Sequence, residues 1–151
     1  MMTAAALTIV AAVILGARIS SRDGATVQAA VRFEVRLAED QPAAGLQAAR
    51  VANSNRVVYL HPDVVVTNAD IARSRVVPGP TPSQFWIDVQ FNTAGAQKMR
   101  QATTNHIGKP VAILIDGDVV TAPTVKSPIG AAAVISGDYT RADAEKIAGG
   151  I

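Results

Sequence analysis

Two segments of the chain place an apolar residue at every second position. Residues 31–37 alternate valine, phenylalanine and leucine with charged residues, and residues 85–91 alternate phenylalanine, isoleucine and valine with Trp86, Asp88 and Gln90. A period of two is typical of strands buried on one face, so we predict a strand over each segment. Trp86 falls on the polar face of the second strand. There it either offers an exposed aromatic contact or packs under the stiff, proline-rich loop 78–83.

Helical spacing begins after Thr93, which is a good N-cap residue. We predict a helix over residues 94–105, because Gly108 and Pro110 follow it as stop signals. The predicted buried face of this helix consists of Ala96, Met99, Ala102 and Thr103.

A short apolar run at 111–115 predicts a strand buried on both faces. Asp116-Gly117 then predicts a tight turn, with a returning strand over 119–122, because both central residues of the favoured hairpin turn need positive φ. The Asp116-Gly117-Asp118 sequence also resembles a cation-binding D-x-D. The hairpin is favoured, because no further carboxylates follow at calcium-loop spacing.

The remaining patterns are shorter. Residues 127–130 predict an irregular connection and 131–136 a strand, while Thr140 and Asp143 form a capping box that starts a helix with a core-facing stripe. Upstream we predict a weak helix or ordered loop over 43–52, strands over 57–60 and 75–77, and a short helix at 67–70. Together these elements predict an α+β fold: an antiparallel or mixed sheet with helices packed on one face, in a ferredoxin-like arrangement.

The order of these landmarks resembles one known module. The Gly-Ala helix, Gly108-Lys109, the apolar strand, the Asp-Gly turn, Ile135-Ser136-Gly137 and the capped final helix are similar to the head of the first periplasmic domain of SecD, a membrane component of bacterial protein export. The resemblance is strongest over 108–143, covers 57–151 well and extends loosely over 30–56. It implies a domain that contacts a translocating polypeptide outside the inner membrane. The chain has at most one apolar span, so we expect no proton-driven motor from it alone.

Composition narrows the function classes. The 151 residues are 49% hydrophobic, which is enough for one domain with a real core, and include no cysteine, so disulfides and thiolate chemistry are excluded. Of 14 basic and 12 acidic residues, two arginines and one aspartate fall within residues 1–29, leaving 12 and 11 in the remainder. This near-neutral balance without a basic stripe argues against a nucleic-acid partner.

The N-terminal 29 residues form a separate predicted unit. Residues 2–17 are apolar apart from two threonines, which fits a signal-peptide core or a short membrane anchor better than a buried helix. Val27-Gln28-Ala29 is a candidate cleavage site. No basic residue precedes the apolar run, and Arg18 and Arg22 follow it, against the usual charge bias. We therefore expect an export or anchoring segment over 1–29, contact with the membrane only through residues 2–17, and a head-like domain over 30–151.

Candidate chemistry is sparse. His61 and His106 are far apart in sequence, and we interpret them as a turn residue and a helix C-terminal residue rather than metal ligands. Asp88 paired with Asp70 or Glu34 would make an acid/base couple, but no pattern brings them together. No hydrolase, metalloprotease, phosphate-binding or dinucleotide-binding motif occurs. We predict no catalytic, cofactor-binding or metal-binding residues and no cofactor.

Two functional hypotheses follow. The first is a non-catalytic polypeptide-binding module, exported or anchored on the periplasmic side of the inner membrane, that assists or modulates translocation. Its partners would be unfolded or translocating polypeptide and, as a further candidate, the Sec translocon. The second is a structural or assembly domain that binds a fixed folded envelope partner, since a fold does not define a function. An enzyme is a distant third.

Overall fold

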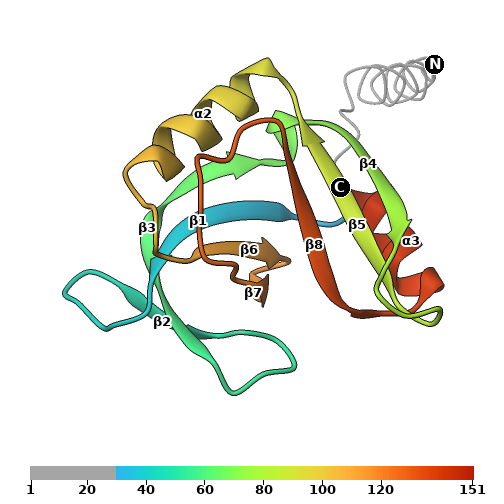
Figure 1. Cartoon of the computed structure of the whole chain (residues 1–151), viewed down its shortest axis with the longest axis horizontal. Coiled ribbons are helices and arrows are strands. Elements are labelled where there is room, and N and C mark those ends of the chain that lie inside the picture. The colour runs from blue at the N-terminus through green and yellow to red at the C-terminus, as the bar shows by residue number, and fades with distance from the viewer. Residues whose placement is uncertain (1–29) are drawn as a thin grey trace, which may run out of the picture.

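Two antiparallel sheets and two α-helices make up residues 30–151, the part of the chain that the computed structural model describes (Figure 1). The elements in chain order are β1 (Phe33–Glu39), β2 (Gln47–Arg50), β3 (Val57–Thr67), the 3-10 turn η1 (Asn68–Asp70), β4 (Ile71–Pro78), β5 (Phe85–Phe91), α2 (Thr93–Thr104), β6 (Val111–Ile115), β7 (Asp118–Thr121), β8 (Ala132–Tyr139) and α3 (Arg141–Gly150).

The larger sheet has the strand order β2-β3-β1-β6-β7 and curls on itself. Its two edges meet where the Ala52 N–H, just beyond β2, donates to the Val119 carbonyl of β7 at 2.8 Å. One face buries a small core made of Ala38, Val51, Val58, Leu60, Ala112, Leu114, Val119 and Ala122. The prediction that 111–115 is buried on both faces is confirmed, because its alternate residues enter two different cores.

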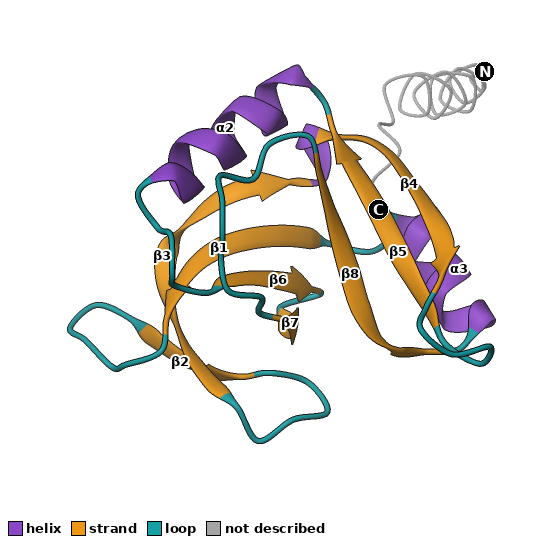
Figure 2. Cartoon of the chain, viewed as in Figure 1, coloured by secondary structure: helices purple, strands orange, loops and turns teal. Residues whose placement is uncertain are grey.

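The main core lies between the other face of the large sheet, the smaller sheet β4-β5-β8 and both helices (Figure 2). Its fully enclosed side chains include Phe33 and Val35 from the large sheet and Ile87 and Ile135 from the small one. Met99 enters from α2, and Ala144 from α3. Both predicted alternating strands and the predicted buried face of α2 therefore supply this core, which holds the two sheets at a fixed distance.

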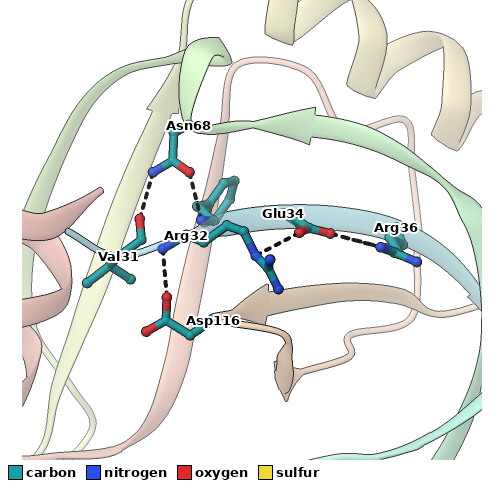
Figure 3. Close-up of polar contacts among 7 residues, drawn as sticks. Val31, Arg32, Glu34, Arg36, Asn68 and Asp116 are labelled. Atoms are coloured by element: carbon teal, nitrogen blue, oxygen red, sulfur yellow. Dashed lines mark hydrogen bonds and ion pairs between the residues drawn. The ribbon is translucent and has the colours of Figure 1, made fainter. Parts of the chain in front are cut away.

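Glu34 departs from the alternation in β1. It was expected on a solvated face, yet it is only 9% exposed, because the curl of the large sheet covers that face as well. Its carboxylate is held by Arg32 Nε at 3.0 Å and by Arg36 Nη2 at 3.1 Å (Figure 3). A buried carboxylate requires such partners. The two ion pairs of Glu34 are therefore explained by the burial of its carboxylate in the folded protein.

The start of β1 is fixed by side chains from two other segments (Figure 3). Asn68 Oδ1 accepts from the Phe33 N–H at 2.8 Å, and Asn68 Nδ2 donates to the Val31 carbonyl at 2.9 Å. Asp116 Oδ1 accepts from the Arg32 N–H at 2.8 Å. These bonds satisfy backbone groups where the strand ladder begins.

Several turn and cap predictions are confirmed. Asp116 and Gly117 have φ of 50° and 90°, as the predicted hairpin turn requires. Thr67 and Asp70 form a complete capping box at η1. At α3, Thr140 accepts from the Asp143 N–H. These signals are local, so tertiary packing did not alter them.

Other predictions, of the sheet arrangement and of the bounds of several elements, were wrong. The structure has two sheets where we predicted one, and the ferredoxin-like arrangement is not confirmed. Residues 47–50 form the strand β2 within the segment predicted as weak helix or loop, because an open edge of β3 pairs with them. Strand β3 continues through Pro62 to Thr67, well beyond the predicted 57–60. The N-cap of α2 is Asn92 rather than Thr93, because the Asn92 side chain accepts from the Gly95 N–H at 2.8 Å.

The predicted export segment, residues 2–17, and the cleavage candidate at 27–29 lie outside the described residues. Within residues 30–151, none of the helices combines the length and the apolar character that crossing a membrane requires.

Candidate functional site

β8 is an edge strand of the small sheet, paired with β5 on one side only. It passes beside β7 of the large sheet (Figure 1) without joining its ladder. The first half of β8 is uncharged, and Val134 is 43% exposed there. Unpaired backbone groups beside apolar side chains are a natural acceptor for an additional extended chain.

The other edge of the small sheet, β4, is less suited to accept a strand. It carries the exposed residues Arg73 and Arg75 and ends at Pro78. Basic side chains and proline on an edge strand oppose pairing with another chain. Of the two edges of this sheet, the structure therefore leaves β8 as the receptive one.

An apolar cavity of about 270 Å³ opens beside the first half of β8. Its walls come from both sheets, from α2 and from the connection before β8, and include Val35, Met99, Val111, Ile113, Ile129 and Val134. All of the residues that line it are apolar. Such a cavity is suited to an aliphatic or aromatic side chain and unsuited to a charged one.

Thr103 holds the connection that closes this cavity. Its Oγ1 donates to the Met99 carbonyl at 2.7 Å and accepts from the Ile129 N–H at 2.8 Å. The hydroxyl is fully buried, so both bonds are needed to offset its desolvation. Ile129 is thereby fixed against the predicted buried face of α2.

A second hollow, of about 340 Å³, lies beside the second half of β8. Its lining includes Trp86, Tyr139, Pro80, Gln84, Ser136 and Asp138. Trp86 is half-buried and lines this hollow together with Pro80 of the proline-rich loop. Burial raises the pKa of Tyr139 above its ordinary 10.0.

The two hollows are separated at one point. Thr121 Oγ1 of β7 lies 3.5 Å from Ser136 Oγ of β8, so side chains of the two sheets meet here. The cavity touches residues 132–134, and the hollow touches residues 136–139. We call the two spaces together the β8 crevice. It could not be predicted from sequence, because it depends on the order of strands in two separate sheets.

The acidic residues considered for acid/base chemistry are not brought together. Each is held by a different basic side chain: Glu34 by two arginines, Asp88 by Arg75 at 3.1 Å and Asp70 by Lys98 at 2.8 Å. Burial raises the pKa of Asp70, but the Lys98 ammonium and the Thr67 N–H more than offset that and hold it below its ordinary 3.8. These carboxylates are structural charges rather than paired acids.

The two histidines are brought together, which the sequence did not indicate. Their ring centroids lie 5.9 Å apart in an edge-to-face contact. His61 lies inside β3, so its interpretation as a turn residue was wrong. His106 is buried just beyond α2, and its Nε2 lies 2.7 Å from the Ala38 carbonyl and 3.1 Å from that of Pro110. Because both partners are acceptors, Nε2 carries a proton and donates. Within residues 30–151 no group of three His, Asp or Glu residues is placed to hold a metal.

Glu39 links this histidine pair to the solvent. Its Oε1 lies 3.0 Å from His61 Nε2, and its Oε2 lies 3.3 Å from Lys109 Nζ. The hydrogen bond with His61 and the Lys109 ammonium hold the pKa of Glu39 below its usual 4.5, although partial burial acts in the opposite direction.

We predict that Glu39→Gln lowers stability at neutral pH but not in acid. A lowered folded-state pKa stabilises the fold above the unfolded-state value, and this contribution disappears as the pH falls through the folded-state pKa. The loss near pH 6 should be about 0.5 kcal/mol, as for an exposed pair. Denaturant titrations at a series of pH values measure it. Asp63→Asn, at an exposed site without an ion pair among the described residues, is the control. An equal loss at every pH would contradict the prediction.

The fold and the crevice define an α+β domain of two antiparallel sheets that leaves one strand edge open between them. Comparison with known families gives a specific assignment. Residues 43–151 match the family model described as SecDF, P1 head subdomain. The chain belongs to this family.

Relatives and solved structures agree with that assignment. The chain is 37% identical over 87 residues to the protein translocase subunit SecD of Acidaminococcus fermentans, covering 57% of this chain and 21% of that protein. It is 31% identical over 99 residues to SecD of Endomicrobium trichonymphae, covering 64% of this chain and 21% of that protein. A crystal structure of SecDF in a super-membrane-facing form superposes with a TM-score of 0.64 at 26% identity, covering 80% of this chain and 18% of that one. The chain thus spans about a fifth of the length of these proteins.

Proposed function

We propose that this chain is an exported or membrane-anchored polypeptide-binding module that assists or modulates protein translocation. The observation that carries the proposal is the uncharged, open edge of β8 beside an apolar cavity in a SecDF P1 head domain. An extended segment would add to the edge through backbone hydrogen bonds and place one apolar side chain in the cavity. Because the backbone of every polypeptide offers the same bonds, such a site accepts many sequences.

The proposal places residues 30–151 on the periplasmic side of the inner membrane, with residues 1–29 as signal peptide or anchor. Support comes from the apolar run at 2–17 and from membership of a SecDF family. The Sec translocon is a proposed further partner, and the proposed role is non-catalytic. Mass spectrometry of the native N-terminus distinguishes a cleaved segment from a retained one, and a cytoplasmic product beginning at Met1 would contradict export.

Binding should be weak. We predict dissociation constants of about 10 μM to 1 mM, or roughly 4 to 7 kcal/mol, for an unfolded secretory protein. A single strand edge offers far less area than a stable interface of about 1,600 Å², and a chain in transit must be released. NMR titration of the full chain with a reduced, unfolded secretory protein measures this, and the shifts should centre on residues 132–134 and on the cavity.

A matched pair of variants tests the location. Val134→Lys places a charge on the receptive edge and should weaken binding about threefold to tenfold, since Lys opposes strand addition. Val57→Lys changes the chain identically on β3, at a residue 38% exposed against 43% for Val134, and should leave binding unchanged. Absence of shifts at millimolar peptide would overturn the polypeptide-binding proposal and favour a fixed folded partner instead.

A further inference from the structure

The hollow at Trp86 has a chemical character opposite to that of the apolar cavity. Asp138 is the one charged residue that lines it, and Asp138 Oδ1 accepts a hydrogen bond from Gln84 Nε2. Among residues 30–151 no basic side chain lies within ion-pair distance of Asp138, whereas Asp88 of the same sheet is paired with Arg75. This hollow therefore presents an exposed carboxylate beside an indole.

The surroundings of Asp138 extend the negative charge. A neighbouring hollow shares Asp138 and Tyr139 and adds Asp116, Asp143 and Lys146. The charged residues that line the two hollows are thus three aspartates and one lysine. A cation is attracted to such a region, and an anion is repelled.

Trp86 adds a second attraction for a cation. Indole binds ammonium and guanidinium groups through its ring quadrupole more strongly than other aromatic rings. Lysine and arginine also carry an aliphatic stem that packs against apolar walls while the charged end remains in water. Pro80 and the Trp86 ring offer such a wall, with the Asp138 carboxylate in the same hollow.

The spacing along β8 connects this hollow with the apolar cavity. The centres of the two contacted stretches, Ala133 and Gly137, are about four residues or 13 Å apart in a strand. Side chains at positions i and i+4 of an extended peptide point to the same side. Because β7 approaches β8 at Thr121 and Ser136, between the two spaces, a segment that pairs with residues 132–134 would pass over this contact in extended form and present its second side chain to the hollow of Trp86.

Building on the proposed function, we infer that the β8 crevice selects extended segments that carry an apolar residue and, about four residues away, a lysine or arginine. The apolar side chain enters the cavity, and the basic side chain enters the hollow of Trp86 and Asp138. Salt distinguishes the two contacts. Added salt should not weaken the apolar contact in the cavity, but it should weaken the contact of the basic side chain with Asp138.

A peptide series tests the inference with the full chain. Peptides of about ten residues carry one leucine in a Ser/Thr background, either alone or with lysine or glutamate four residues toward one or the other terminus. Lysine at one of the two placements should tighten binding about threefold to tenfold over leucine alone, the gain expected from one exposed cation–π contact with an ion pair. Glutamate at that placement should weaken binding. Trp86 is the only tryptophan of the chain, so its fluorescence reports occupation of this hollow directly.

Asp138→Asn should reduce the advantage of lysine, because the contribution of Trp86 remains, and it should leave binding of the leucine-only peptide unchanged. Asp63→Asn makes the same change of charge at an exposed residue that lines neither space, and should preserve the advantage. Equal affinities for the leucine, lysine and glutamate peptides would overturn the inference while leaving the proposed function intact. Equal effects of the two substitutions would also overturn it. Failure of every peptide to bind would overturn both.

Discussion

Gly95→Ala should destabilise the protein by about 2 kcal/mol, although alanine is the better helix former. A Cβ at this position of α2 would lie 2.7 Å from the Asp70 carbonyl oxygen and 2.8 Å from Asp70 Cβ. The contact involves backbone, so it cannot be relieved by a rotamer change, and overpacking of this kind costs about 1 to 3 kcal/mol. The helix must move away from η1, to which the Asn92 cap and the Lys98–Asp70 ion pair attach it.

The matched control has the opposite expected sign. Gly149 also lies in a helix, α3, but a Cβ there would meet nothing within 4 Å. Gly149→Ala should therefore stabilise the protein by about 0.5 to 1 kcal/mol through the usual helix propensity. Denaturant midpoints of the two variants give the comparison. A stabilised Gly95→Ala would contradict the close approach of α2 to η1.

The sequence predicted those features that depend on neighbouring residues. The period of two in 31–37 and 85–91 identified β1 and β5, and the cap residues Thr67 and Thr140 identified the starts of η1 and α3, although only Thr67 forms the complete predicted capping box. In each case the physical cause lies within a few residues of its effect. The order of these local landmarks along the chain also predicted the family, the SecDF P1 head subdomain.

Features that depend on distant segments were not predictable in this way. β2 has no strong pattern of its own and exists because β3 offers it an edge. The burial of Glu34 depends on the packing of both faces of the large sheet, and the contact of His61 with His106 brings β3 together with the segment after α2. The β8 crevice requires knowing that β8 ends one sheet while β7 ends another. None of these juxtapositions has a signal at fixed sequence spacing.

Residues with strong local sequence patterns and residues that line the β8 crevice are largely different sets. The landmarks that help to identify the family, such as the Asp-Gly turn and the caps, are local structural devices that position the elements. The proposed contacts instead come from residues with weak individual patterns, such as Ala133, Val134 and Asp138. Variation at those positions can therefore change what the crevice accepts while the fold remains the same.

Gly117→Val should destabilise the protein by about 1 to 3 kcal/mol, because a β-branched residue is poorly tolerated at positive φ. Gly117 has φ of 90° in the turn between β6 and β7. Its added Cβ would meet only the end of the flexible Arg32 side chain at 3.1 Å, so the cost comes from the backbone and not from a clash.

The same variant separates the hairpin from the cation-binding interpretation of Asp116-Gly117-Asp118. Asp116 Oδ1 already accepts from the Arg32 N–H, and these carboxylates belong to no group of three potential metal ligands within residues 30–151. The denaturant midpoint of the unaltered chain should therefore stay the same when calcium or manganese is added, while that of Gly117→Val falls in either condition. If the midpoint instead rose with metal and Gly117→Val left it unchanged, the turn would be a ligand loop, because a ligand that binds only the folded state stabilises it by mass action.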